Sequence, residues 1–189
     1  MSKNRLEAFS DGVVAILITI LVLELKVPHG TDFAALRPLF PTFLTYVLSF
    51  VYIAIYWNNH HHMLHATERI NGKILWANMH LMFWLSLVPF VTGWMGANHF
   101  APLPTAAYGV VLLMAAIAYT ILQVALVRHH GLASRLATAV GSDRKGKLSI
   151  AGYVAAIPLA FVHQSISHAI YALIALMWLV PDQRIEKGV

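Results

Sequence analysis

The sequence predicts an all-α membrane protein with six transmembrane helices in a single domain, residues 1–189. Hydrophobic residues make up 59% of the chain and charged residues 11%, and the mean hydropathy of +0.67 exceeds that of soluble globular domains. The apolar residues fall into runs close to the length of about 20 residues that a membrane-spanning helix requires. The basic residues lie between these runs, as they do in loops that flank a membrane.

Six apolar segments are the expected spans, at about residues 5–27, 36–60, 72–96, 105–128, 148–163 and 165–181. The first span follows Lys3 and Arg5, an arrangement that also occurs in signal peptides. No small-residue cleavage site follows it, and Glu7 and Asp11 lie on its basic side. We therefore expect a retained first span.

Three prolines bear on the second and third spans. Pro38 and Pro41 lie in the first turns of the second span, where a missing backbone N–H is tolerated. Pro89 lies inside the third span, where it removes a helical hydrogen bond. The sequence therefore predicts a kink at Pro89, with neighbouring helices satisfying the freed carbonyl.

The second half of the chain is less regular. Residues 128–147 form its most polar stretch and are expected to be a surface loop with room for a short interfacial helix. Residues 148–180 carry no charge and are too long for one ordinary span. We expect two short spans that meet near His163 and Gln164, and a single long tilted helix is the alternative.

The basic residues predict the orientation of the protein in a cell membrane. With a cytoplasmic N-terminus, only Lys26 and Arg37 lie outside, and 11 of the 13 Lys and Arg residues lie inside. The inside residues are Lys3, Arg5, Arg69, Lys73, Arg128, Arg135, Arg144, Lys145, Lys147, Arg184 and Lys187. This asymmetry predicts a multi-pass protein with both termini in the cytoplasm, and it explains the net charge of +5 without a nucleic-acid partner.

One face of the first span carries a regular set of residues. An arc of about 100° on a helical projection contains Gly12, Ile16, Thr19, Ile20, Leu23 and Val27. Such a stripe most often packs against another helix or lipid, but it also fits a pore lining whose aliphatic rings close the passage by dewetting. Thr19 is equally ambiguous, because a threonine hydroxyl either bonds to its own helix or replaces part of an ion's hydration shell.

Asp11 lies where the apolar part of the first span begins, and it points about 140° away from Ile16. A carboxylate in a span is costly, so it is expected to be paired or hydrated. Glu7 is like-charged and Arg5 lies on another face, so the partner should come from a neighbouring helix. The candidates at the same depth are Trp57, His61, His62, Trp76 and Asn78.

The sequence argues against a metal site, a cofactor site and an enzyme. His61 and His65 share a helix face within the run His60, His61, His62 and His65, which is the spacing of two metal ligands. No H-E-x-x-H pattern, cysteine, nucleophile motif or phosphate-binding glycine loop accompanies them. We therefore expect no catalytic activity, no bound metal or cofactor, and we identify no small-molecule substrate.

The start of the chain resembles the signature of a known family. Arg5, followed after three residues by Phe9-Ser10-Asp11, opens a span that continues GVVAILITILVLELKVP. This stretch is similar to the prokaryotic homologues of transmembrane protein 175, a potassium-channel family. Residues 55–65, IYWNNHHHMLH, and residues 75–96, LWANMHLMFWLSLVPFVTGWMG, resemble the same family. The second half agrees only in its number of spans and its basic loop.

The resemblance implies a homotetramer of six-span subunits, with a central pore lined by the four first helices. Ile16 corresponds to the family's hydrophobic constriction, and Ile20 and Leu23 correspond to further apolar layers. Thr19 corresponds to the layer implicated in potassium preference. Animal members are expected to carry two such repeats, so one repeat implies a bacterial subunit in the inner membrane.

The resemblance also gives a role to the polar residues of the signature. Arg5, Ser10 and Asp11 are expected to hold the first helix against the second and third. Asp11 lies off the stripe, which fits that role. Glu24 lies about 80° from Ile16 near the outer mouth, where it would raise the local concentration of cations.

Together these features predict a potassium-selective or potassium-preferring cation channel with a hydrophobic gate. Potassium is expected as the permeating ion, and the resemblance also allows proton conduction. The alternative is a proton-coupled secondary transporter that uses Asp11 and the histidine cluster. Such transporters normally have broken helices at the membrane midplane, which the sequence indicates only at Pro89.

Overall fold

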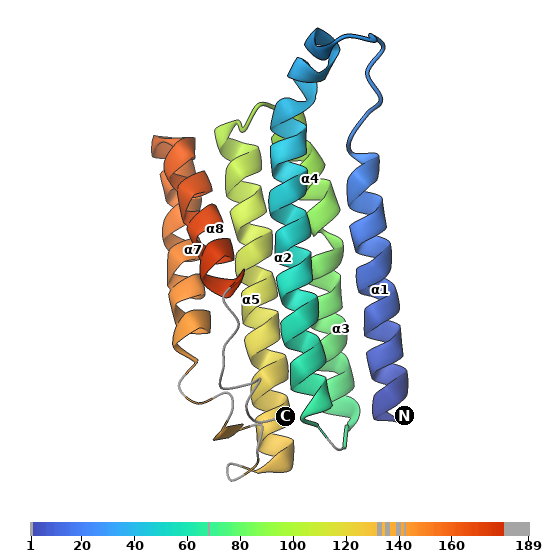
Figure 1. The fold of residues 1–189 in the computed structure, drawn as a ribbon. Helices are drawn as coiled ribbons and strands as arrows, with labels where there is room; N and C mark the ends of the chain where they lie inside the picture. The colour runs from blue at the N-terminus through green and yellow to red at the C-terminus, as the bar shows by residue number, and fades with distance from the viewer. Residues whose placement is uncertain are drawn as a thin grey trace.

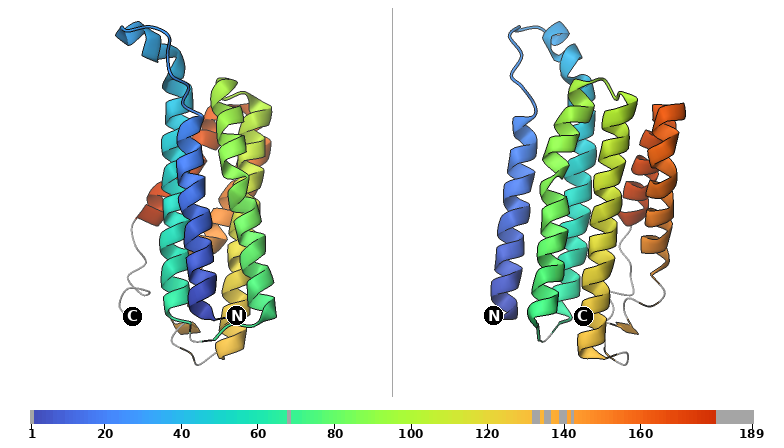
Figure 2. Two further views of the ribbon diagram at one scale, coloured as in Figure 1. Left: turned by 90° about the vertical axis from the view of Figure 1, so that its right-hand side faces the viewer. Right: turned by 180° about the vertical axis from the view of Figure 1, so that it is seen from behind.

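A computed structural model describes residues 2–67, 69–131, 134, 137–138, 141 and 143–179. Its helices are α1 Lys3–Leu23, the 3-10 helix η1 Phe33–Leu39, α2 Phe40–His65, α3 Gly72–Ser86, α4 Val88–Ala97, α5 Pro102–His130, α7 Arg144–Val162 and α8 Gln164–Leu179. They form one bundle, with α1 at one edge and the α7–α8 pair at the opposite edge (Figures 1 and 2). All regular elements within the described ranges are helical, which confirms the all-α prediction.

The helices have the lengths that a membrane protein needs. Five stretches are long and apolar enough to cross a membrane: 3–23, 33–65, 72–97, 102–130 and 144–162. The sixth, α8, is apolar but has only 16 residues. The prediction of six membrane helices is therefore confirmed, with the last one shorter than the others.

The first span ends earlier than predicted. Helix α1 stops at Leu23, and the backbone N–H of Glu24 bonds to the carbonyl of Leu21 at 3.3 Å. Pro28 disfavours a helical conformation at Val27, which explains why the helix does not continue to residue 27. Val27 is consequently outside the helix, and its assignment to the stripe is wrong.

The second span has two parts and ends later than predicted. Its start is η1, which contains Pro38 and is capped by Asp32, whose carboxylate accepts the N–H of Ala35 at 3.1 Å. Helix α2 then continues past residue 60 to His65. Within this last part the rings of His61 and His65 stack, with centroids 6.1 Å apart.

The third span contains the break that Pro89 predicts. Helix α3 ends at Ser86, and α4 begins at Val88 with Pro89 in its first turn. At the break the N–H of Leu87 bonds to the carbonyl of Trp84 at 3.2 Å, a tighter turn than the α-helical pattern. The ladder resumes when the N–H of Val91 bonds to the carbonyl of Leu87.

The last two spans form a helical hairpin that turns at His163, as the sequence predicts. His163 has an extended backbone, φ −159°, between α7 and α8, so the single long helix is wrong. The Ser167 hydroxyl donates to the carbonyl of Ala156 at 2.7 Å and ties the two helices together. Helix α7 begins at Arg144 instead of 148, because Asp143 caps it by accepting the N–H of Gly146.

Several sequence predictions fall outside the described residues. These are most of the interfacial helix expected within 128–147, the last two positions of the sixth span, and the cations Arg135, Arg184 and Lys187. Apart from Lys26 and Arg37, the described Lys and Arg residues belong to segments at one end of the bundle. The start of α1, the α2–α3 connection, the end of α5 and the start of α7 all lie there (Figure 1).

Candidate functional site

Helix α1 has one buried face and one open face. Its buried residues are Leu6, Ser10, Val14, Leu17 and Leu21. The stripe lies on the open face, where Ile16 is 58% exposed and Leu23 is 73% exposed. Gly12, Thr19 and Ile20 are exposed as well. Because α1 stands at the edge of the bundle (Figure 2), the stripe is available to lipid or to another subunit.

The hydroxyl of Thr19 is oriented by its own helix. It donates to the carbonyl of Ile16 at 2.8 Å, which is the ordinary behaviour of a helical threonine. Since the proton is engaged in that bond, the oxygen lone pairs remain free. The exposed oxygen of Thr19 therefore acts as an acceptor on the same face as Ile16 and Ile20.

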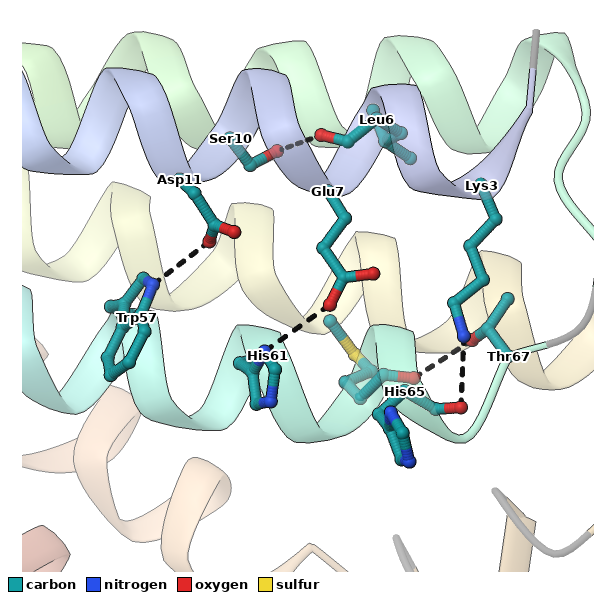
Figure 3. Close-up of polar contacts among 10 residues, drawn as sticks. Lys3, Leu6, Glu7, Ser10, Asp11, Trp57, His61, His65 and Thr67 are labelled. Carbon is teal, nitrogen blue, oxygen red and sulfur yellow. Dashed lines mark hydrogen bonds and ion pairs between the residues drawn. The ribbon is translucent and has the colours of Figure 1, made fainter.

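The opposite side of α1 is attached to α2 by a ladder of three polar contacts. On each helix the three residues are spaced by four, and the helices run antiparallel, so the contacts succeed one another along the interface (Figure 3). The pairs are Lys3 with His65, Glu7 with His61, and Asp11 with Trp57. We call these six residues the α1–α2 ladder.

The distances in the ladder are those of direct contacts. The Lys3 ammonium donates to the carbonyl oxygen of His65 at 3.1 Å. The Nδ1 atom of His61 lies 3.3 Å from the Glu7 carboxylate. The indole N–H of Trp57 donates to the Asp11 carboxylate at 2.9 Å, which gives this acid the neighbouring-helix partner that its position in a span demands.

A buried chain of hydrogen bonds connects α1, α3 and α2 beside the ladder. The Ser10 hydroxyl donates to the carbonyl of Leu6 at 2.9 Å, so it must accept from the Asn78 amide nitrogen, 3.0 Å away. That orientation turns the Asn78 carbonyl oxygen toward His60 Nε2, which donates to it at 2.7 Å. Ser10, Asn78 and His60 are all buried.

The structure brings some of the predicted network together and leaves other members apart. Ser10, Asp11, Trp57, His61 and Asn78 lie in the contacts just described. The remaining predicted members take no part in these bonds: Arg5 is exposed, Phe9 is 45% exposed, Trp76 is 78% exposed, and the half-buried His62 packs edge to face on His61.

Sequence reasoning missed His60 and Glu7 as members of the network. The sequence does contain a signal for His60, since it lies three and four residues before Met63 and Leu64 and seven after Ile53, all buried. That spacing places His60 on the core face of α2, away from the neighbouring histidines. Glu7 carries no comparable signal, because only the rotation of α1 against α2 reveals that it meets His61.

Glu24 is turned toward α4. Its half-buried carboxylate lies against Gly93, where a methyl group on Gly93 would overlap it. The side chain therefore packs on a neighbouring helix instead of extending along the open face of α1. Glycine at position 93 makes this close approach between the two elements possible.

The histidines at the end of α2 do not form a metal site with other described side chains. No group of three or more His, Asp or Glu residues is placed to hold a metal ion among the residues that the structure describes. His61 instead engages Glu7 and stacks on Trp57, with ring centroids 5.9 Å apart.

We expect Trp57→Phe to loosen α1 from α2, because it keeps an aromatic ring but removes the donor to Asp11. Because the chain lacks cysteine, Val14→Cys, at a buried position of α1, provides a single reporter of the exposure of that helix. The maleimide-labelling rate of this reporter should rise roughly fivefold, the equivalent of about 1 kcal/mol for one partly exposed hydrogen bond. An unchanged labelling rate would show that the bond does not hold α1.

The matched control is Trp84→Phe in the same reporter background. The Trp84 indole donates to His80 at 2.9 Å within α3, so this change also removes an indole hydrogen bond but none between α1 and α2. It should leave the labelling rate of Val14→Cys within about twofold of the parent protein.

Comparison with known proteins places this geometry in a family. The family model described as "Endosomal/lysosomal potassium channel TMEM175" matches residues 5–89. A potassium channel of Chryseobacterium sp. (strain P1-3) is 54% identical over 188 residues, covering 100% of this chain and 98% of the relative. The human endosomal/lysosomal proton channel TMEM175 is 36% identical over 96 residues, covering 44% of this chain and 19% of that protein.

A solved structure extends the match over both halves of the chain. The crystal structure of a lysosomal potassium-selective channel TMEM175 homologue from Chamaesiphon minutus superposes with a TM-score of 0.82 at 27% sequence identity. The superposition covers 95% of this chain and 97% of that one. The signature resemblance is thus confirmed, and the chain belongs to the family of the endosomal/lysosomal potassium channel TMEM175.

Proposed function

We propose that this protein is a potassium-preferring cation channel in which four copies of α1 surround the conducting pathway. The observation that carries the proposal is the open stripe on α1, opposite a face that is fixed to α2 and α3. Relatives that cover 93–100% of the chain are named as potassium channels, which supports a channel over the proton-coupled transporter. Purified protein in liposomes should pass potassium down its gradient.

The stripe has the chemistry of a hydrophobic gate. Ile16, Ile20 and Leu23 lie along about 10 Å of the helix axis. Four copies would give stacked aliphatic rings that exclude water when narrow. Ile16 would form the narrowest ring, and Glu24, which contacts α4, would contribute negative charge near the outer end without lining the gate.

The proposal includes the number of subunits and the orientation of the protein in the membrane. A homotetramer would enclose the stripe, and a mass measurement in detergent tests that number directly. Both termini would face the cytoplasm of a bacterial cell, because the basic end of the bundle would lie on the inner side of the cell membrane. The channel would need no cofactor and would catalyse no reaction, and the human relative's name supports a test of proton flux.

We expect Thr19→Val to lower the preference for potassium over sodium. Valine has nearly the same shape but lacks the acceptor oxygen that would replace part of the hydration shell of a permeating ion. The permeability ratio, measured from bi-ionic reversal potentials, should fall by roughly threefold or more, and Thr19→Ser should retain most of it. An unchanged ratio would exclude Thr19 from selectivity.

Thr45→Val is the matched control for that experiment. Its hydroxyl also bonds to the carbonyl three residues before it, Thr42, at 2.8 Å. It lies buried on α2, away from the stripe, so the ratio should stay that of the unmodified channel.

A further inference from the structure

A groove between α3 and α5 opens at the basic end of the bundle. Its volume is about 560 Å³, and it is lined by Asn71, Lys73, Thr120, Ile121, Val124, Ala125, Arg128 and His129. Lys73, Arg128 and His129 are exposed, so their charged or polar ends are available to a ligand. The groove involves neither the stripe nor the α1–α2 ladder.

The groove changes from apolar to basic along one face of α5. Ile121, Val124 and Arg128 are spaced by three and four residues, so they follow one another on the same side of the helix. Ile121 is 45% exposed and Val124 is 41% exposed, so they present an apolar surface in the part of the groove that lies deeper in the span. Over roughly 10 Å the lining thus passes from hydrocarbon to guanidinium.

The hydrogen bonds of Asn71 determine which nitrogen of His129 can donate to a ligand at the basic end of the groove. Its carbonyl oxygen accepts the N–H of Ile74 at 3.0 Å, so its amide nitrogen faces His129 Nδ1 at 3.1 Å. An amide nitrogen only donates, so Nδ1 accepts, and the neutral His129 ring carries its proton on Nε2. Asn71 thereby fixes the orientation of the His129 ring, and the Nε2–H of that ring remains a hydrogen-bond donor.

The basic end therefore combines three donors: the Lys73 ammonium, the Arg128 guanidinium and the His129 Nε2–H. None of the eight described residues that line the groove is acidic, so the local charge is positive. Lysine and arginine at this position match the phosphate of a membrane lipid, and arginine can bind two of its oxygens at once.

We propose that this groove binds an anionic phospholipid, with its phosphate between Lys73 and Arg128 and an acyl chain along Ile121 and Val124. Charge complementarity selects the headgroup, and the apolar continuation of the groove into the span selects a lipid over a free phosphate. Trp76 is 78% exposed one turn into α3, and tryptophan is enriched where membrane spans meet the headgroup region. The proposal requires only that the helices span a membrane. It can therefore be tested independently of ion conduction.

The test measures lipid retention by native mass spectrometry of the full-length protein in detergent. Dioleoyl phosphatidylglycerol is titrated against dioleoyl phosphatidylcholine, which has the same chains and no net charge. The unmodified protein should retain phosphatidylglycerol preferentially. Lys73→Gln with Arg128→Gln should weaken that retention roughly 25-fold, at about fivefold for each cation removed. The single variant Arg128→Lys, which keeps both positive charges, should retain most of the preference for phosphatidylglycerol.

A matched double variant separates the groove from general surface charge. Arg144 and Lys147 are exposed basic residues at the same end of the bundle, but they do not line the groove. Arg144→Gln with Lys147→Gln removes the same charge and should leave retention within about twofold. Equal weakening by both double variants, or equal retention of both lipids, would overturn the proposal. So would displacement of the lipid by millimolar glycerol phosphate, because that result would mark a site for a soluble anion.

Discussion

Replacing Ile16 with asparagine is expected to raise the potassium flux of reconstituted protein at least roughly tenfold, which corresponds to a barrier lower by about 1.4 kcal/mol. Asparagine has the same number of side-chain heavy atoms as isoleucine but binds water by hydrogen bonds, so a ring of four asparagines would wet a constriction that isoleucine keeps dry. The measurement is the rate of a potassium-driven fluorescence change in liposomes at equal protein content. The proposed constriction is the most exposed large hydrophobic residue at the middle of α1, with 58% of its surface free.

Val22→Asn is the control for this substitution. Val22 lies on the same helix and is 46% exposed, but it is outside the arc that contains Ile16, Thr19 and Ile20. It should leave the flux within about twofold of the unmodified protein. If neither the unmodified protein nor Ile16→Asn passes potassium, the channel proposal fails; if both asparagine variants conduct equally, Ile16 is not the gate.

Asn78→Ala is expected to have the largest effect on stability. It removes the partner of the Ser10 hydroxyl and the partner of His60 Nε2 in one step, at a site where all three side chains are buried. The variant leaves the buried His60 Nε2–H without a partner and removes one bond from Ser10, whose hydroxyl still donates to Leu6. Together these losses cost about 2–4 kcal/mol, which should lower the melting temperature in detergent by roughly 5–15 °C. Scanning fluorimetry of the purified protein gives this value directly.

Asn98→Ala provides the comparison for that experiment. The Asn98 amide also donates a hydrogen bond, to the carbonyl of Trp94 at 2.8 Å, but it is exposed at the end of α4 and water can replace it. Its melting temperature should change by no more than about 2 °C. A comparable small change for Asn78→Ala would mean that the buried chain of hydrogen bonds does not stabilise the contact of α1 with α3 and α2.

The face of α1 that bears Ile16 could be predicted from the sequence because helical periodicity is fixed by the backbone. Gly12, Thr19, Ile20 and Leu23 share that face in the structure, as the spacing requires. Val27 failed the same test because the periodicity says nothing about where a helix ends. Its end depends on the cap at Glu24 and on Pro28, which are local signals that a projection ignores.

Contacts between helices were predictable only in part. A carboxylate in a span needs a partner, so chemistry alone pointed Asp11 to a short set of residues that included Trp57. The pairing of Glu7 with His61 and the packing of Glu24 on Gly93 depend on the depth and rotation of α1 against its neighbours. Those quantities arise from the packing of the whole bundle, and no short stretch of sequence contains them.

The short helical hairpin at the far edge has a consequence for the surrounding lipid. Between Lys147 and His163 the apolar part of α7 rises only roughly 22 Å, against about 30 Å for the hydrocarbon layer of a typical bilayer. The bilayer must therefore thin along this edge, or Lys147 must reach outward to the headgroups. In a tetramer built around α1, the four α7–α8 hairpins would lie on the outer perimeter. Each tetramer would therefore be surrounded by a ring of thinned bilayer. Short-chain lipids would lower the elastic free energy of that thinned ring. Two neighbouring tetramers would also lower it, because they would share part of the thinned bilayer.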